Sequence, residues 1–408
     1  MIDISGKNNC CGCAACAQAC PKQCILMKQD AEGFLYPQVN TSSCIDCGLC
    51  EKVCPFIHPY EARTPMHTYA AINNNEKIRM ESSSGGIFTL LAERILNDGG
   101  VVFGARFDEN WQVTIDYTES IEGLAAFRGS KYVQASVGNT YAVCANFLKT
   151  GRKVMFSGTP CQIAGLKHYL HKEYENLLLV DFVCHGVPSP KVWAKYLHEV
   201  VGTVNVRGVS MRDKLHEGWK RFNFVIDYKK GGEKISILSW HQENDYMNAF
   251  LRDMILRPSC YACKSRECRS HSDITIADFW GIQNICPTMD DDKGTGLVLI
   301  HTEKGKKNVS FDKMKYEEVT FEEGFRNNSA ILRSAKPWPR RAEFFRKLDN
   351  EDGVVDLIRR TLRPTVQMRL KSIIRMVVYF TIRIIRKTTR IMRVGLGEKT
   401  NNTNEHQH

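Results

Sequence analysis

Eight of the 17 cysteines in this 408-residue chain stand near its start, in two runs of the same spacing. Each run has the pattern C-x2-C-x2-C-x3-C-P, and the runs are Cys10, Cys13, Cys16, Cys20 and Cys44, Cys47, Cys50, Cys54. Thiolates at this spacing bind the irons of a [4Fe–4S] cubane, so the two runs predict two clusters. A pair of such clusters passes single electrons but performs no substrate chemistry. We therefore expect another part of the chain, or a partner, to use the electrons.

The fourth cysteine of each run is expected to bind the cluster of the other run. Three thiolates two residues apart can surround one cubane, while the fourth follows a longer gap and reaches the second cubane. The predicted ligand sets are Cys10, Cys13, Cys16 with Cys54, and Cys44, Cys47, Cys50 with Cys20. A zinc ribbon is the alternative, but zinc sites usually use separated C-x2-C pairs. Two cysteines are left over, Cys11 and Cys24, and we interpret both as structural.

Four further cysteines lie where an α/β protein collects ligands. Cys161 follows a predicted strand and opens a predicted helix, Cys184 also follows a strand, and Cys260 and Cys263 form a CYAC sequence. Ligands gather at the carboxyl ends of parallel strands, and a helix N-terminus stabilises a thiolate. The residues alone leave a third cluster, a zinc site and scattered core cysteines as interpretations. Cys268 is a candidate substitute ligand, and we interpret Cys144 and Cys286 as structural.

Two short stretches have the composition of an anion or cofactor site. Residues 82–86 (SSSGG) precede a predicted helix, where small residues and free amide groups favour a phosphate. Residues 129–134 (GSKYVQ) offer a cation and an aromatic ring. An ordinary serine-rich helix cap and an ordinary surface turn explain the two stretches equally well.

The order of apolar patterns predicts several domains. Residues 1–60 form a cysteine-rich module that metal must stabilise, and 59–65 form a linker. Residues 68–200 alternate predicted strands (68–72, 101–105, 153–156, 177–183) with predicted helices (86–96, 139–148, 162–170, 190–200). This alternation predicts an α/β layer with parallel strand pairs. Residues 201–350 are richer in strands (222–228, 234–240, 273–279, 297–301) and predict an α+β domain.

The net charge of +11 belongs to one C-terminal segment. Between residues 359 and 393 stand eleven Lys and Arg residues and no acid, so the remainder of the chain is neutral. This distribution argues against a nucleic-acid-binding protein. Within a tail domain at 351–396, residues 365–393 sort into a cationic and an apolar helical face, which predicts an amphipathic helix on an anionic membrane surface or on a protein. Residues 397–408 are expected to be disordered.

The N-terminal residues lack an apolar core, and no run of about 18 apolar residues exists. Cluster chemistry also needs reduced thiols. We therefore expect a cytoplasmic protein, with the tail allowing a peripheral position at the inner face of the membrane.

Seven stretches together resemble the coenzyme F420 hydrogenase/dehydrogenase beta subunit family, here with a ferredoxin-type domain before it. They are SSSGG at 82–86, GSKYVQ at 129–134, FSGTPCQIAGL at 156–166, VDFVCHGVPSP at 180–190, RPSCYAC at 257–263, DITIADFWGI at 273–282 and DDDKGTGLVLI at 290–300. The resemblance implies a flavoprotein body that contains FAD and one more [4Fe–4S] cluster. It implies Cys161, Cys184, Cys260 and Cys263 as the ligands of that cluster. It also implies FAD contacts from Ser83, Ser84, Gly85, Lys131, Tyr132 and Gln134, with walls from Asp278, Phe279 and Trp280.

The leading hypothesis is a flavin-dependent iron–sulfur oxidoreductase that passes electrons between a ferredoxin-like partner, the clusters, FAD and a small organic acceptor. A flavin suits this position because it converts single electrons into hydride. The alternative is a non-catalytic subunit that relays electrons to a partner enzyme. A third hypothesis is a membrane-surface assembly protein with structural clusters. The residues identify neither a catalytic side chain nor the acceptor, and a deazaflavin substrate does not follow from them.

Overall fold

The structure is a computed structural model that describes residues 1–202 and 205–365. The chain divides into two compact units, residues 1–358 and residues 359–408, and only the first seven residues of the second unit are described. The expected helix at 365–393 and the expected disordered end at 397–408 therefore lie, apart from Thr365, outside the described residues.

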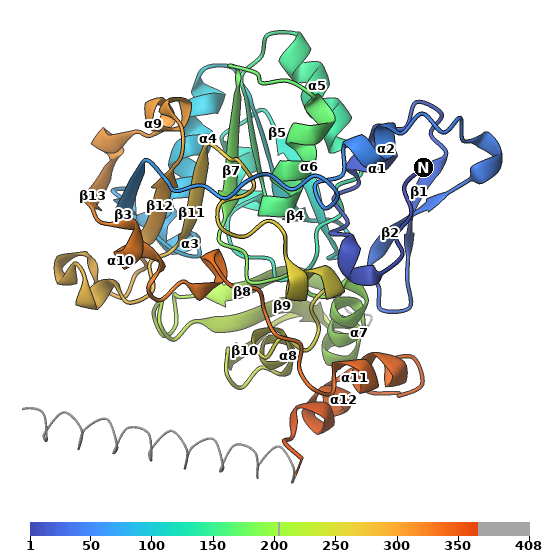
Figure 1. The fold of residues 1–408 in the computed structure, drawn as a ribbon. Coiled ribbons are helices and arrows are strands. Elements are labelled where there is room, and N and C mark those ends of the chain that lie inside the picture. The colour runs from blue at the N-terminus through green and yellow to red at the C-terminus, as the bar shows by residue number, and fades with distance from the viewer. Residues whose placement is uncertain (203–204, 366–408) are drawn as a thin grey trace, which may run out of the picture. The chain divides into compact units, whose positions relative to one another are not determined.

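The N-terminal module is an antiparallel ribbon of β1 (Ile25–Gln29) and β2 (Leu35–Val39) beside two four-residue helices, α1 (Ala15–Gln18) and α2 (Leu49–Lys52) (Figure 1). Each of these helices begins inside a cysteine run, because one left-handed residue precedes it: Ala14 (φ 58°) before α1 and Gly48 (φ 73°) before α2. The module has few large apolar side chains, and its own cysteines form much of its interior. It thus has the small dicluster ferredoxin-like architecture that the sequence predicts.

The body is built on one eight-stranded sheet with the order β13-β3-β12-β11-β7-β6-β4-β5. Its strands are β3 (His67–Asn73), β4 (Val101–Phe107), β5 (Val113–Thr118), β6 (Val154–Gly158), β7 (Leu177–Phe182), β11 (Ile274–Asp278), β12 (Gly296–Ile300) and β13 (Met314–Glu318). The inner strands β4, β6, β7 and β11 are parallel, and the other strands join the sheet antiparallel. The expected α/β layer with parallel pairs is therefore present.

Helices cover both faces of this sheet, and the side chains alternate to meet them (Figure 1). The helices that contact the sheet are α3 (Glu76–Glu81), α4 (Ile87–Asn97), α5 (Thr140–Lys149), α6 (Pro160–Leu170), α9 (Glu303–Asn308) and α10 (Phe321–Phe325). The remaining helices are α7 (Pro190–Val201), α8 (Asp245–Leu251), α11 (Arg341–Lys347) and α12 (Val354–Leu362). Along β6, Val154 and Phe156 pack with α5, α6 and the N-terminal module, while Met155 packs with α4 on the other face. The cysteine module thus shares a core with one face of the sheet.

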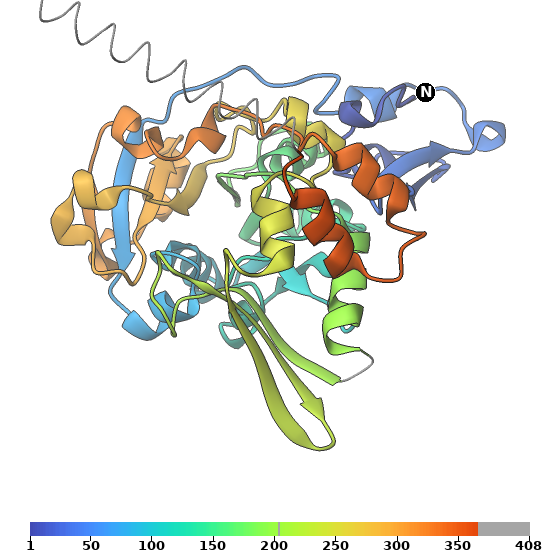
Figure 2. The same cartoon turned by 90° about the horizontal axis from the view of Figure 1, so that it is seen from below.

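A second sheet contains β8 (Asn205–Asp213), β9 (Asn223–Lys230) and β10 (Glu233–Trp240) in antiparallel order and extends away from the large sheet (Figure 2). Strands β11 and β12 follow it in sequence but return to the large sheet. The segments 68–200 and 201–350 therefore contribute to one common sheet. All eight strands and four helices expected in these segments are found, with boundaries shifted by a few residues.

The linker between module and body is held by a ring sandwich. Tyr60 stacks between His168 and His271, with ring centroids 4.5 Å apart on both sides. The two imidazoles also bond to the linker backbone, at His58 O (2.9 Å) and Glu61 O (3.1 Å). Residues 58–61 are thereby attached to the body. Among the helices that the structure describes, none combines the length and apolar character needed to cross a bilayer.

Candidate functional site

The first predicted ligand set lines a hollow of about 310 Å³ in the N-terminal module. Cys10, Cys13 and Cys16 come from the first run and Cys54 from the end of the second. Cys11 and the apolar side chains of Ile2, Ile4, Met27 and Pro37 complete the lining. Cys13, Cys16 and Cys54 are buried.

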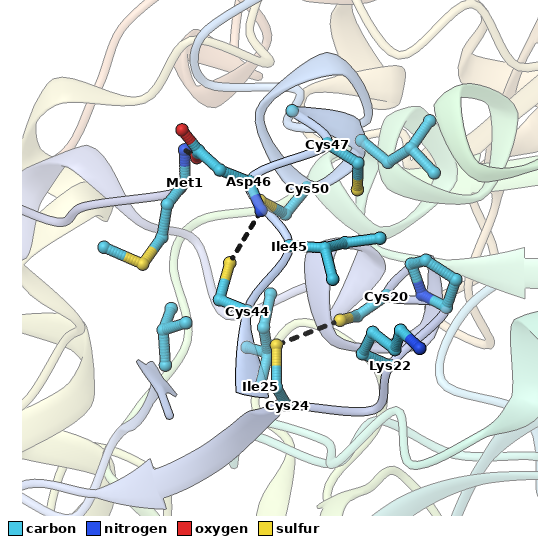
Figure 3. Close-up of a pocket in the computed structure, with 14 residues that line it drawn as sticks. Met1, Cys20, Lys22, Cys24, Ile25, Cys44, Ile45, Asp46, Cys47 and Cys50 are labelled. Carbon is cyan, nitrogen blue, oxygen red and sulfur yellow. Dashed lines mark hydrogen bonds and ion pairs between the residues drawn. The ribbon is translucent and has the colours of Figure 1, made fainter. Parts of the chain in front are cut away.

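The second predicted set lines another hollow, of about 340 Å³ (Figure 3). Cys44, Cys47 and Cys50 come from the second run, and Cys20 is the fourth cysteine of the first run. Cys24 also lines this hollow, and its Sγ lies 3.4 Å from that of Cys20. Cys47 is exposed, so this hollow is the more accessible of the two.

Each hollow thus takes three cysteines from one run and the last cysteine of the other, as the crossed pattern requires. In residues 1–202 and 205–365, no group of three or more His, Cys, Asp or Glu side chains gathers tightly enough to bind a single metal ion. A cubane binds each thiolate to a different iron and so accepts a wider ring of sulfurs. The donor chemistry and the shape of both hollows fit [4Fe–4S] clusters.

The protein's own electrostatics oppose ionised thiols in the first hollow. Burial, together with the charges of Cys10 and Cys54, raises the pKa of Cys16 to about 12. Without a cation Cys16 therefore holds its proton, and iron would displace it on binding.

The four body cysteines come together at the carboxyl edge of β6 and β7. Cys161 lies in the first turn of α6, which directly follows β6 and begins with a capping box between Thr159 and Gln162. Cys184 lies two residues after β7. Cys260 and Cys263 lie in and just after a 3-10 turn, Pro258–Ala262.

The thiols of these four residues are close enough to perturb one another. Burial raises the pKa of Cys184 well above its ordinary value, and the charges of Cys260, Cys161 and Cys263 raise it further. Burial likewise raises the pKa of Cys260 to about 12. Arg266 opposes this effect at Cys184 and donates to the carbonyl oxygens of Cys184 and His185. The site is a set of four half-buried thiols with a guanidinium beside it.

The remaining cysteines are placed differently. Cys268 interacts with Asp181 and Arg63 and is not among the groups that perturb the four thiols. Cys144 is buried in the core under α5, and Cys286 lies near the carboxylates of Glu317 and Glu323.

Cys11 connects the first hollow with the body set, which its spacing did not indicate. Its thiol packs beside those of Cys13 and Cys161, close enough for these thiols to perturb one another's ionisation. The neighbouring Cys11 thiol is also the main reason why the pKa of Cys161 lies well above its ordinary value. The two groups of thiols are therefore in direct contact through one cysteine.

The serine–glycine stretch lies against the backbone of two strands. Gly85 has no space for a side chain, because a Cβ there would lie 2.4 Å from Ala71 O and 2.5 Å from Gly296 N. Ser84 Oγ donates to Thr295 O at 2.9 Å. Ser83 Oγ accepts from Ser130 Oγ at 2.8 Å, which joins this stretch to the 129–134 loop.

The 129–134 loop runs from the serine–glycine stretch to the clusters. Lys131 Nζ donates to carbonyls of its own turn, at 2.9 Å to Arg128 O, and burial lowers its pKa to about 7. The Tyr132 ring stacks on Phe250 at 4.5 Å. Gln134 lies at the far end, where its Nε2 donates to Cys11 O at 3.1 Å. The predicted cofactor residues therefore divide between the two ends of one loop.

Two cations that the sequence did not single out lie beside the serine–glycine stretch. Lys214 Nζ donates to Ser84 O at 2.8 Å, and burial lowers the pKa of Lys214 to about 7, helped by the charges of Arg79 and Arg212. Arg212 is buried and donates to Asp278, while its Nε and Nη2 have no hydrogen-bond partner among the described residues. Arg79 pairs with Asp291 at 2.5 Å. This region holds buried positive charge that a bound anion would neutralise.

The predicted wall residues are only partly at this site. Asp278 accepts from Arg212 and from Trp219 Nε1 at 2.9 Å, and Trp280 stacks on Trp219 at 4.6 Å. The guanidinium of Arg212 lies 5.3 Å from the Trp280 ring. Phe279 is fully buried in the core instead.

Comparison with known proteins places these features in a family. Residues 9–57 match the 4Fe-4S dicluster domain. Residues 68–140 match the N-terminal part, and residues 151–323 the C-terminal part, of the coenzyme F420 hydrogenase/dehydrogenase beta subunit. No curated protein matches the chain.

Among solved structures, the chain is similar to one from the study "Xenon derivatization of the F420-reducing [NiFe] hydrogenase complex from Methanosarcina barkeri". The two are 18% identical, the similarity covers 74% of this chain and 92% of the other, and the TM-score is 0.42.

The two beta-subunit matches together span more than half of the chain, and the dicluster match precedes them. The resemblance expected from the motifs is thereby confirmed. This iron–sulfur electron-transfer protein belongs to the coenzyme F420 hydrogenase/dehydrogenase beta subunit family.

Proposed function

We propose that the chain is a flavin-dependent iron–sulfur oxidoreductase with three clusters in series. In this proposal, single electrons pass between a ferredoxin-like partner and the cluster of Cys20, Cys44, Cys47 and Cys50. They continue through the cluster of Cys10, Cys13, Cys16 and Cys54 to a third cluster on Cys161, Cys184, Cys260 and Cys263. FAD at the serine–glycine stretch then exchanges hydride with a small organic acceptor.

The observation that carries the proposal is the contact between the two thiol groups. The Cys11 thiol packs against Cys13 of the first set and against Cys161 of the body set, and the three thiols perturb one another's ionisation. The body set has four half-buried sulfur donors and no nearby carboxylate among the groups that perturb it most. These features favour a soft, sulfur-ligated iron centre.

The cation-rich region beside Ser84 supports a bound dinucleotide. A buried cation is costly unless an anion faces it, and among the described residues no carboxylate lies within ion-pair distance of Lys214. Arg212 pairs with Asp278 but keeps two donor nitrogens without a partner in the same part of the chain. A diphosphate supplies the missing charge, and the Trp219–Trp280 stack offers a flat apolar surface next to it. Ser83, Ser84, Gly85, Lys131 and Tyr132 would then hold the cofactor. When bound, FAD takes electrons singly and releases two together as hydride.

The 129–134 loop places this region near the clusters. Ser130 contacts the serine–glycine stretch and Gln134 contacts Cys11, four residues later. Four extended residues span about 14 Å at most. A second connection runs through rings, since Tyr132 stacks on Phe250 and Phe250 meets His185, the neighbour of Cys184 (5.1 Å). The short span supports direct electron transfer between the third cluster and a flavin.

The exposure of the cysteines indicates which of the proposed clusters exchanges electrons with the external partner. Cys47 is exposed and Cys44 and Cys20 are half-buried, whereas Cys13, Cys16 and Cys54 are buried. Ile45, an apolar side chain that lines the accessible hollow, is also exposed. We therefore propose that the external one-electron partner docks at the second set.

Two further proposals rest on the sequence. We propose the domain division 1–60, 68–200, 201–350 and 351–396, of which residues 366–396 lie outside the described part of the chain. We also propose that residues 365–393 bind an anionic membrane surface.

The test is anaerobic purification of the full chain, flavin extraction, and reduction of its FAD by a chemically reduced ferredoxin. Cys161→Ser should slow flavin reduction sharply while the two N-terminal clusters remain reducible. Cys144→Ser, at a cysteine buried outside both thiol groups, is the matched control and should behave as the wild type. If the purified protein contained intact clusters but no flavin, the enzyme hypothesis would be refuted and the relay-subunit alternative would stand. Equal flavin reduction in both variants would remove the third cluster from the path.

A further inference from the structure

The side chain of Arg257 joins the body thiol set to the first ligand set. Its main chain is bonded to the segments that carry the body set. Its N–H donates to Val187 O and its carbonyl accepts from Cys260 N, both at 2.9 Å. Its guanidinium enters the N-terminal module instead. There Nε donates to Cys10 O at 2.8 Å and Nη2 donates to Leu35 O at 2.9 Å.

This cation has no carboxylate partner within ion-pair distance among the residues that the structure describes. Arg257 is 0% exposed. The two carboxylates in its vicinity have other cations, since Asp30 pairs with Lys7 and Glu32 with Arg341, both at 2.6 Å. A fully buried guanidinium without a counter-ion is strongly unfavourable. The anion that compensates Arg257 must therefore be a group absent from the protein chain alone, or the thiolates themselves.

Several contacts aim the guanidinium at the first ligand set. Nη2 lies 3.5 Å from Cys10 Sγ, and the plane of the guanidinium lies 4.2 Å from the Tyr36 ring centroid. Gln134 Oε1 accepts from Nη1 at 3.0 Å. A Cβ at Gly12 would lie 2.8 Å from Nη1, so glycine leaves the space that the guanidinium needs. The position is set from both sides of the boundary between module and body.

We propose that Arg257 is the fixed counter-ion of the cluster on Cys10, Cys13, Cys16 and Cys54, and that it raises the reduction potential of that cluster. A cluster gains one negative charge when it is reduced. A buried cation and an N–H···S hydrogen bond stabilise the reduced form more than the oxidised form. Arg257 is thus a positioning and potential-setting residue. The inference depends on the clusters of the dicluster domain and is independent of flavin.

The experiment is an anaerobic redox titration of the full chain, followed by electron paramagnetic resonance. Arg257→Gln should move the midpoint potential of one cluster to more negative values, and Cys10→Ser identifies that cluster because it alters the same signal. Arg257→Lys keeps the charge and should recover most of the shift. Gln134→Glu leaves the guanidinium in place but puts a carboxylate on its Nη1, so it should also lower the potential. The iron content of the Gln134→Glu variant reports whether its cluster is intact.

Arg106→Gln is the matched control. It removes a half-buried guanidinium on β4 that pairs with Asp116 on β5, outside both thiol sets and the proposed flavin site, and should leave every cluster potential unchanged. An unchanged potential in both Arg257→Gln and Gln134→Glu, with full iron content, would overturn the proposal. So would a shift in Arg257→Lys as large as that in Arg257→Gln, because charge would then not be the cause. If Arg257→Gln fails to load iron, Gln134→Glu alone decides.

Discussion

If FAD binds beside Ser84 as proposed, the buried ammonium of Lys214 should make this binding depend on pH. In the protein without ligand, burial and the neighbouring charges of Arg79 and Arg212 lower the pKa of Lys214 to about 7. A diphosphate bound beside Ser84 would reverse this effect, because the anion favours the charged lysine. Above pH 7 the protein must then take up a proton when FAD binds.

The size of this effect follows from linkage. At pH values above the lowered pKa, each pH unit weakens binding by up to about tenfold, or about 1.4 kcal/mol, as long as the bound form stays protonated. Because the lysine is already half deprotonated at pH 7, the dissociation constant should rise by up to about 50-fold from pH 7 to pH 9. The same lysine makes the flavin-free protein more stable as the pH rises from about 7 to about 10, because only the unfolded chain then holds the proton.

The assay is anaerobic calorimetry of FAD binding to the flavin-free protein between pH 6 and pH 9, in two buffers of different ionisation enthalpy. Lys214→Met should abolish the pH dependence and weaken binding at pH 7 by about 1.5–3 kcal/mol, the value of a charge-assisted hydrogen bond. Lys293→Met is the control, since Lys293 lies in the adjacent loop but is half-exposed and pairs with Glu76. A pH slope that survives in Lys214→Met, or no slope in the wild type, would refute this view of the site.

Three further predictions test other parts of the molecule. Gly85→Ala should destabilise the chain by about 3 kcal/mol, because the new methyl group meets strand backbone. Gly6→Ala is the control and should cost less than about 1 kcal/mol, because its methyl group meets the flexible end of Asn8. Thermal unfolding measures the stability of both variants. Tyr60→Ala should expose the linker to trypsin at Arg63, while Tyr117→Ala, at an exposed ring on β5, should not; equal digestion would show that the ring sandwich does not hold the linker. Deletion of residues 365–408 should abolish sedimentation with anionic liposomes, and equal sedimentation would end the membrane proposal.

The local parts of this arrangement could be predicted from the sequence because each depends on short spacing. The crossed cysteine sets follow from two gaps of two and one of three residues, and both hollows have the expected lining. The strands and helices of the body could also be predicted from the pattern of apolar residues. In β6 the alternation of Val154, Met155 and Phe156 reflects a sheet with a helix on each face.

The parts that sequence reasoning missed depend on long-range packing. Arg257 reads as an ordinary arginine before a CYAC sequence, and only the docking of the module against the body puts it on Cys10. Lys214 lies directly after β8, far along the chain from the stretch that it contacts. Cys11 appeared to be a spare buried cysteine for the same reason. No local pattern records which of two distant segments will meet.

Gln134 shows a related limit. It shares a six-residue motif with Lys131 and Tyr132, and the resemblance assigned all three to the flavin. The structure places its amide between Cys11 O and Arg257. The motif therefore contains residues that contact two different sites, and a resemblance in sequence does not separate them.

The measurement that tests the central claim most directly is the content of iron and acid-labile sulfide in the full chain, purified without oxygen. Three cubanes predict about twelve of each per chain, and Cys161→Ser should lower both to about eight. Cys144→Ser should leave both unchanged. A wild-type protein with no iron or labile sulfide, or with zinc in their place, would contradict the account.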